Sequence, residues 1–198
     1  MYEIEKIDLR VKYTREWTFE ALQKLLMKKE LSDIKVSEII VKAGISRATF
    51  YRNFSTKEDV VKHKVNMFFN TFYDELITDF SSSLERDEVM LVQEFFRRID
   101  IEEELVDTVI KCNLEYLMVE GILKMINIFN ELFYQIVKTS KVSESYTMDI
   151  VASSAWTLLS RWHKTGKKET PGKLSKIYIS AFKNIYLALY EDKTLIGD

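Results

Sequence analysis

Apolar side chains recur three or four positions apart along most of the chain, a spacing that places them on one face of an α-helix. The first such segment covers 9–29, and two short segments follow at 36–43 and 47–54. A fourth segment continues from there to about residue 80. The apolar face expected for the first segment is formed by Trp17, Ala21, Leu22, Leu25 and Leu26. The pattern predicts four helices in this part of the chain.

The remainder of the chain predicts five further helices. They are expected at 85–98, 101–110, 113–138, 143–163 and 171–192. Gly121 is a candidate break in the third of these, and the serine run at 81–83 is the nearest thing to a hinge. One proline and five glycines are too few turn residues for a strand-rich architecture. We therefore expect an all-α fold of about nine helices.

Several helix ends are marked by local chemistry. Gly44 can adopt the left-handed backbone that ends a helix, and Ser46 can cap the next one. Two overlapping capping boxes, Ser55 with Glu58 and Thr56 with Asp59, predict the start of the long helix that follows. Thr170-Pro171 predicts the start of the last helix, since proline is well tolerated at a first helical position.

The segment from Val36 to Lys57 has the layout of a helix-turn-helix. Its second helix, which begins at Arg47, is short, cationic and rich in hydrogen-bonding groups, as is typical of a helix that enters a DNA major groove. Lys57 starts the next helix, whose N-terminal dipole favours a phosphate. The residues expected to contact DNA are Lys35, Ser37, Ser46, Arg47, Thr49, Tyr51, Arg52, Asn53 and Lys57.

Charge is unevenly distributed along the chain. Residues 1–64 carry 14 Lys or Arg and 10 Asp or Glu, a net charge of +4, whereas residues 65–198 carry a net charge of −6. A basic N-terminal part on an acidic remainder favours phosphate binding at the N-terminal end. The formal net charge of −2 for the whole chain argues neither for nor against nucleic acid.

Other classes of protein lack support in the sequence. No run of about 18 uncharged apolar residues predicts a transmembrane helix, and the N-terminal MYEIEKIDLR lacks the apolar centre of a secretory signal. The single cysteine, Cys112, excludes an intramolecular disulfide, fits a reducing cytoplasm and is expected to be buried. Two isolated histidines predict no metal site, and no nucleophile–base pair or glycine-rich loop indicates an enzyme or a bound cofactor.

The helix-turn-helix region resembles the tetracycline-repressor (TetR/AcrR) family of transcriptional regulators. The Ala43-Gly44 turn, the run Thr49–Phe54 and then Lys57-Glu58 follow that family's pattern, and the resemblance covers roughly 10–64. The stretch Asp8–Glu16 is similar to the start of regulators of dihydroxyacetone kinase. One position departs from the pattern: many members carry Thr or Ser where this chain has Lys35, and a lysine cannot cap a helix.

The resemblance implies a helix-turn-helix DNA-binding domain at 1–56 and a helical effector-binding and dimerisation domain at 57–198. In the second domain it implies an apolar effector pocket, for which the candidates are Phe69, Phe72, Phe96, Tyr116, Phe129 and Phe133. It also implies a four-helix interface between two copies, for which the candidates are Val151, Ala155, Leu158, Trp162, Ile177, Ala181 and Ile185. Plain core packing is the alternative interpretation of these apolar side chains.

We therefore expect a cytoplasmic, sequence-specific transcriptional regulator, a repressor that leaves a palindromic operator when a small-molecule effector binds. Its expected partners are double-stranded operator DNA, an effector of unknown identity and a second copy of the chain, with no membrane, metal or cofactor. The alternative is a protein of the same fold that acts by contacting another protein, with DNA binding secondary or lost.

Overall fold

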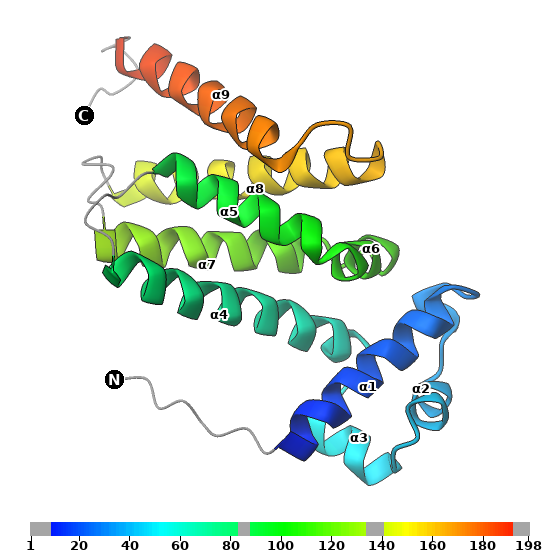
Figure 1. Cartoon of the computed structure of the whole chain (residues 1–198). Coiled ribbons are helices and arrows are strands. Elements are labelled where there is room, and N and C mark those ends of the chain that lie inside the picture. The colour runs from blue at the N-terminus through cyan, green and yellow to red at the C-terminus, as the bar shows by residue number, and fades with distance from the viewer. Residues whose placement is uncertain (1–8, 83–87, 134–140, 192–198) are drawn as a thin grey trace. The chain divides into compact units, whose positions relative to one another are not determined.

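The computed structural model describes residues 9–82, 88–133 and 141–191, and within these ranges the regular structure is entirely helical (Figure 1). This confirms the predicted all-α fold. The elements in chain order are α1 (Leu9–Leu26), η1 (Leu31–Asp33), α2 (Val36–Ala43), α3 (Arg47–Asn53), α4 (Glu58–Ser82), α5 (Glu88–Ile101), α6 (Glu103–Lys111), α7 (Tyr116–Phe133), α8 (Lys141–Lys164) and α9 (Pro171–Glu191). None of the helices described here has the length and apolar character needed to span a bilayer.

One compact unit comprises the described residues up to Phe68 together with Asp107–Met118. We call Leu9–Phe68 the head. In the head α1 packs on α2, and α2 packs on α3. The side chains at the centre of its core are almost completely buried: Leu22, Ile34, Ile39, Phe50, Phe54, Val60 and Val61. Cys112 belongs to this unit and is buried, as predicted, and burial raises the pKa of its thiol to about 11.

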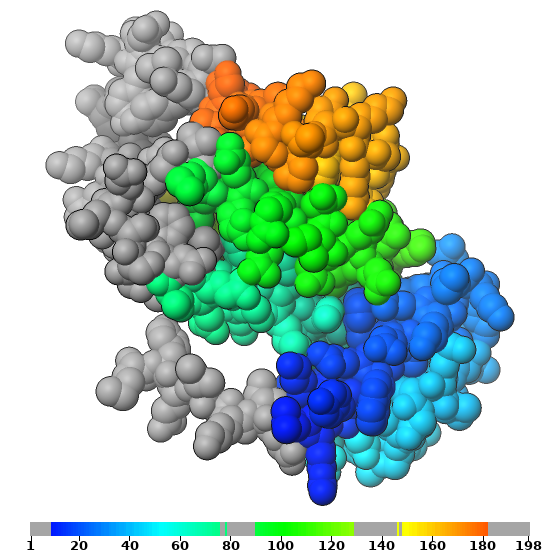
Figure 2. Space-filling view, viewed as in Figure 1, coloured from blue at the N-terminus to red at the C-terminus, as the bar shows by residue number. Residues whose placement is uncertain are grey.

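Trp17 does not belong to the apolar face on which the sequence pattern placed it. Its side chain is 52% exposed, and its ring lies 6.0 Å from that of Tyr13, which is 49% exposed. The surface of α1, dark blue in Figure 2, is open to solvent on the face drawn there. The buried residues of α1 are Thr18, Phe19, Ala21, Leu22 and Leu26, so Ala21, Leu22 and Leu26 lie in the core as predicted.

Helix α2 begins at Val36, as predicted, although Lys35 offers no capping acceptor. The cap is supplied from inside the helix, because the Glu38 carboxylate accepts the backbone N–H of Lys35 at 3.0 Å. The same carboxylate pairs with Lys29 Nζ at 2.5 Å. Together these two donors lower the pKa of Glu38, with the Lys29 hydrogen bond as the larger cause.

The turn between α2 and α3 follows the predicted chemistry. Gly44 has φ 66°, and the backbone N–H of Ile45 donates to the carbonyl of Ile40 at 3.2 Å, which is the six-residue bond of a Schellman motif. Ser46 then caps α3, since its Oγ accepts the backbone N–H of Thr49 at 3.0 Å. These two ends fix the angle at which α3 leaves α2.

Helix α4 starts with one of the two predicted capping boxes. Asp59 Oδ2 accepts the backbone N–H of Thr56 at 2.8 Å, and Thr56 Oγ1 accepts the backbone N–H of Asp59 at 3.1 Å. The helix continues through Ser82, so the part of the serine run that the structure describes is helical rather than a hinge. Ser83 lies outside the described residues.

The second compact unit comprises the described residues of Phe69–Val106 and those from Val119 onward. The sequence placed a single boundary at 56/57. The compact units meet within α4, between Phe68 and Phe69, and 107–118 belong to the first unit; the predicted domain boundary stays a prediction. The first unit extends into α4 because the first turns of that helix carry Val60, Val61 and Val65, which are buried.

The core of the second unit is rich in aromatic rings. Phe72 and Phe95 have ring centroids 5.6 Å apart, and those of Phe96 and Tyr178 are 5.7 Å apart. Burial raises the pKa of Tyr178 to about 12, so its hydroxyl stays protonated and donates to the carbonyl of Val151 at 2.8 Å. That bond ties α9 to α8.

Gly121 does not break α7, which runs unbroken from Tyr116 to Phe133. A β-carbon at this position would lie 2.1 Å from Cε2 of the Phe69 ring. The missing side chain therefore makes room for Phe69 of α4, a close approach that the sequence pattern alone did not reveal.

The join between α8 and α9 follows the sequence prediction. Gly166 has φ 83° and ends α8, while Thr170 Oγ1 accepts the backbone N–H of Lys173 at the start of α9. Trp162 is buried and donates from Nε1 to the carbonyl of Glu169 at 2.9 Å. Lys167 Nζ forms an ion pair with Asp100 Oδ1 at 2.9 Å, which connects this join to α5.

Candidate nucleic-acid interface

The outer surface of α3 carries the side chains that the helical period brings together at 47, 48, 51 and 52. Arg47, Ala48, Tyr51 and Arg52 are exposed, whereas Phe50 is fully buried. We call these four exposed residues the α3 face. It presents two guanidinium groups, a phenol and a methyl group. Ala48 was missed from the sequence because an alanine carries no hydrogen-bonding signal, and only its exposure brings it into the interface.

Arg47 is held in place by Tyr51. The Arg47 Cζ atom lies 5.3 Å from the centroid of the Tyr51 ring, which is a cation–π contact. Such a contact contributes about 0.5–1 kcal/mol at an exposed site. Because the guanidinium is already restrained, less side-chain entropy is lost when it binds a guanine edge or a phosphate.

Ser46 and Thr49 are hydrogen-bonded to each other at the start of α3. Their hydroxyl oxygens lie 2.8 Å apart, in addition to the cap that Ser46 makes to the Thr49 backbone. Ser46 is exposed and Thr49 half-buried. A contact from either hydroxyl to DNA has to use the hydrogen-bonding capacity that the cap leaves over.

Lys35 and Ser37 lie at the N-terminus of α2, and both side chains are exposed. Here the free backbone N–H groups and the helix dipole favour an anion. The Glu38 carboxylate occupies the Lys35 N–H, which leaves the lysine side chain outside the cap. The placement is compatible with the phosphate contacts predicted from the sequence.

Asn53 is turned into the head rather than toward the α3 face. Its Oδ1 accepts a hydrogen bond from Arg15 Nε at 3.1 Å, and its Nδ2 donates to the carbonyl of Thr49 at 2.9 Å. Both ends of the amide are therefore engaged within the protein. The DNA contact predicted for Asn53 from the sequence stays a prediction.

His63 of α4 joins the same network. Its Nε2 lies 3.4 Å from Nη1 of Arg15, and its ring packs against Phe54 at 6.0 Å. Burial, reinforced by the neighbouring charges of Arg15 and Lys64, lowers the pKa of His63 to about 4. The imidazole is therefore neutral near pH 7 and can accept a hydrogen bond from the guanidinium. Arg15 thus links α1, α3 and α4.

Lys57 is also directed inward. Its Nζ donates to three backbone carbonyls of the segment that joins α1 to α2, those of Leu31, Ser32 and Ile34. The distances to Ser32 and Ile34 are 3.1 and 3.0 Å. An ammonium group has three N–H donors, so this arrangement uses all of them. The placement differs from the predicted phosphate contact.

The six aromatic residues predicted to line an effector pocket do not share one environment. Phe69, Phe72 and Phe96 are buried in the second unit, where Phe95 packs against each of them. Tyr116 belongs to the first unit and is 54% exposed. The side chains of Phe129 and Phe133 lie outside the described residues.

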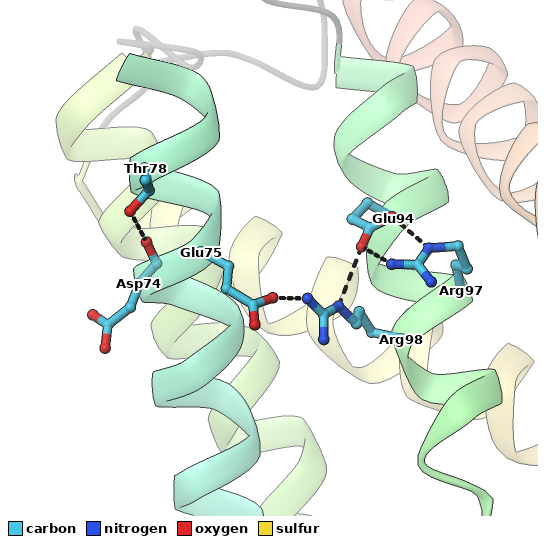
Figure 3. Close-up of polar contacts among 6 residues, drawn as sticks. All are labelled: Asp74, Glu75, Thr78, Glu94, Arg97 and Arg98. Atoms are coloured by element: carbon cyan, nitrogen blue, oxygen red, sulfur yellow. Dashed lines mark hydrogen bonds and ion pairs between the residues drawn. The ribbon is translucent and has the colours of Figure 1, made fainter. Parts of the chain in front are cut away.

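A surface cleft of about 420 Å³ in the second unit is lined by Asp74, Glu75, Thr78 and Arg98. Figure 3 shows that Arg98 of α5 points toward Glu75 of α4, with which it forms an ion pair. Arg98 Nε also lies 3.2 Å from Glu94 Oε1. Because its guanidinium is held between two carboxylates, Arg98 ties α4 to α5. In the described part of the chain, no group of three or more His, Cys, Asp or Glu is placed to hold a metal ion.

The residues predicted for an interface between two copies are also divided. Ala155 and Trp162 are buried within the second unit, and Val151 and Leu158 are half-buried. Ile177 is 47% exposed, and Ala181 is exposed as well. The side chain of Ile185 falls outside the part that the structure describes.

Comparison with known families decides what the head is. Residues 19–63 match the family model described as bacterial regulatory proteins, tetR family. The head carries a tetR-family domain. The resemblance carried by Thr49–Phe54 and Lys57 is thereby confirmed, and the tetR-family domain contains the whole α3 face. Arg15 precedes the matched residues. No curated protein matched the chain.

Solved structures share the fold over most of the chain, beyond the tetR-family domain. Lin0861 from Listeria innocua has a TM-score of 0.76 at 16% identity, over 93% of this chain and 97% of that one. A TetR transcriptional regulator from Streptococcus agalactiae has a TM-score of 0.56 at 16% identity, over 88% of this chain and 96% of that one. The dihydroxyacetone kinase operon activator DhaS has a TM-score of 0.51 at 19% identity, over 88% of this chain and 94% of that one. At these identities the likeness shows the fold alone, so the narrower resemblance to dihydroxyacetone-kinase regulators stays a prediction.

Proposed function

We propose that the protein is a transcriptional regulator that reads operator DNA through the α3 face. The observation that carries the proposal is a tetR-family domain whose short α3 presents two exposed arginines beside an exposed tyrosine. Arg47 and Ala48 stand at the N-terminal end of α3 and read base edges, where arginine takes guanine and a methyl group packs on thymine. Tyr51, Arg52, Lys35 and Ser37 contact phosphates and fix the register.

Two copies of the chain act together in this proposal. A two-fold dimer places two α3 faces on a palindromic operator. Support comes from apolar side chains that α8 and α9 leave exposed, among them Ile150 at 60% and Ile177 at 47%. Association of two copies would remove these apolar side chains from water.

The regulation proposed is repression that a small-molecule effector relieves. The effector binds the second unit and shifts the population toward a state whose two α3 faces no longer match the operator. Helix α4 contributes residues to both units and supplies the connection. A transcriptional reporter tests the sign: we expect the protein to lower transcription from its own promoter. A rise would make it an activator, the role that the name of DhaS assigns to that protein.

The first experiment is a fluorescence anisotropy titration with duplex DNA from upstream of the protein's own gene. Binding should weaken steeply with salt, the logarithm of the association constant falling by about 0.9 per phosphate contact for each tenfold rise in salt. Arg47→Ala should lower the affinity by about tenfold or more and relax discrimination at one base pair. Lys168→Ala, an exposed lysine of the second unit, is the control for the loss of one positive charge.

The alternative, a regulator that contacts another protein, predicts a different result. The parent protein would then show weak binding without preference for the upstream duplex, and Arg47→Ala would behave as Lys168→Ala does. Either finding would remove the α3 face as a reader of DNA sequence.

A further inference from the structure

Lys57 occupies the point where the start of α4 meets the connector between α1 and α2. The connector contains η1, which is closed by the backbone N–H of Ile34 donating to the carbonyl of Leu31 at 3.1 Å. Lys57 Nζ donates to the carbonyls of Leu31, Ser32 and Ile34, which surround it. A cation at the C-terminal end of a helix also interacts favourably with the helix dipole.

The connector leads directly into the N-terminus of α2. Leu31 and Ile34 are 8% and 2% exposed, so their side chains anchor it to the core while Lys57 holds its backbone. The next residues along the chain are Lys35, whose backbone N–H is bound by Glu38, and then Val36 and Ser37 of the first turn of α2. Any movement of the connector therefore moves the N-terminus of α2, where phosphate contacts are proposed.

The ammonium cannot serve the connector and a phosphate at the same time. All three of its N–H groups are directed to carbonyl oxygens. We propose that Lys57 is a positioning residue: it fixes the α1–α2 connector, and with it the N-terminus of α2, and makes no phosphate contact of its own. The effect of Lys57 on operator affinity rests on the proposed function. The contact between Lys57 and the connector does not, because it is present in the free protein.

The chemistry of lysine and arginine separates the two roles. Three carbonyls that converge on one nitrogen suit an ammonium, whereas a guanidinium spreads its donors in a planar fork. Arg at position 57 would keep the charge and serve a phosphate well, but it would not reproduce the convergent contact. A phosphate role therefore predicts that Lys57→Arg retains binding, and a positioning role predicts that it loses it.

The first experiment uses the unaltered protein. Amine-reactive labelling with mass spectrometry should modify Lys57, which directly precedes α4, more slowly than Lys62, an exposed lysine of α4, both without and with the operator duplex. If Lys57 reacts as fast as Lys62 in the free protein and becomes protected only when DNA is added, the inference is wrong and the phosphate contact is right.

The second experiment compares Lys57→Arg, Lys57→Met and the control Lys62→Met. Both Lys57 variants should lose about tenfold in operator affinity, since three backbone carbonyls of the connector lose a charged donor, with less than about twofold change in non-specific affinity. Their salt dependence should equal that of the parent, because no counterion-releasing contact is removed. A variant that is merely less folded would lose affinity for both duplexes equally, so the ratio between them identifies positioning.

Hydrogen exchange in the free protein keeps the two proposals apart. The amides of Asp33 and Ile34, which donate to the carbonyls of Glu30 and Leu31, should exchange faster in both Lys57 variants and not in Lys62→Met. If Lys57→Arg matches the parent in exchange and in affinity, the positioning role is wrong. If the parent binds no operator while exchange behaves as expected, the proposed function fails, and with it the role in DNA binding, although the connector contact itself is upheld.

Discussion

At the scale of single residues, polar side chains join parts of the head that are far apart in sequence. Arg15 donates to Asn53, 38 positions along the chain, and meets His63, 48 positions along. One guanidinium thus joins the end of α3 to the second turn of α4. Because α3 carries the proposed reading surface, the residues behind it decide its orientation as much as those that face DNA.

His63 makes this network sensitive to acid. Its pKa is lowered from 6.5 to about 4 in the folded protein. Between these two values the unfolded chain binds a proton that the folded chain does not, so the free energy of unfolding contributed by this group falls as the pH is lowered from 6.5 to about 4 and levels off below. Arg15 and Lys64 face the ring and oppose its protonation.

The expected result for His63→Gln, which cannot titrate, is a shallower decline of stability over that pH range. Urea unfolding at a series of pH values measures the free energy of unfolding of the variant and of the parent. Carboxylates present in both proteins contribute equally, so their titration cancels in the difference between the two free energies. Ser153→Gln, at an exposed position of α8, is the control for introducing a glutamine. Equal declines in the parent and in His63→Gln would show that the ring is protonated in the folded head.

At the scale of elements, the contact between α4 and α7 depends on a missing side chain. Gly121→Ala would place a β-carbon 2.1 Å from the present position of the Phe69 ring, and the ring is packed among other aromatics. We expect the variant to lose about 1–3 kcal/mol of unfolding free energy, the usual effect of overpacking a core. Thermal unfolding followed by circular dichroism measures it.

The matched control is Gly172→Ala in the first turn of α9. No atom lies within 4 Å of a β-carbon built there, so alanine should stabilise that helix by up to about 1 kcal/mol. Replacing Phe69 by Leu in the Gly121→Ala background should recover part of the loss. A Gly121→Ala protein as stable as the parent would mean that the two helices can separate without cost.

Helix ends could be predicted from the sequence because their chemistry is local. The Gly44 turn, the Ser46 cap and the Thr56–Asp59 box each involve residues at most a few positions apart. The exposure of Arg47 and Arg52 likewise follows from the period of one short helix. Contacts with a distant partner could not be predicted this way. These are the hydrogen bonds of Asn53 to Arg15 and of Lys57 to Ile34, and the approach of Phe69 to Gly121.

At the scale of the whole molecule, the function proposed here requires two copies of the chain. Ile177→Glu places a charge on an exposed apolar position of α9, and a charge buried without a partner opposes association strongly. We expect this variant to be monomeric by sedimentation velocity at concentrations where the parent is dimeric, and to lose most of its operator affinity. The control is Ile101→Glu at the end of α5, whose side chain is 61% exposed.

If Ile101→Glu dissociates the dimer and Ile177→Glu does not, the interface lies elsewhere on the second unit. If the parent itself is monomeric, the proposal of a two-fold complex on a palindromic operator is wrong. The α3 face would then have to recognise a single half-site.

The exposure of Trp17 gives the protein an internal optical probe. The chain has three tryptophans; Trp17 lies in the head at 52% exposure, while Trp156 and Trp162 are buried in the second unit at 5% and 3%. A soluble quencher such as iodide reaches the first and is excluded from the other two. The quenchable, red-shifted part of the emission therefore reports on the head and the protected, blue-shifted part on the second unit, so one cuvette can follow DNA and effector binding without a label.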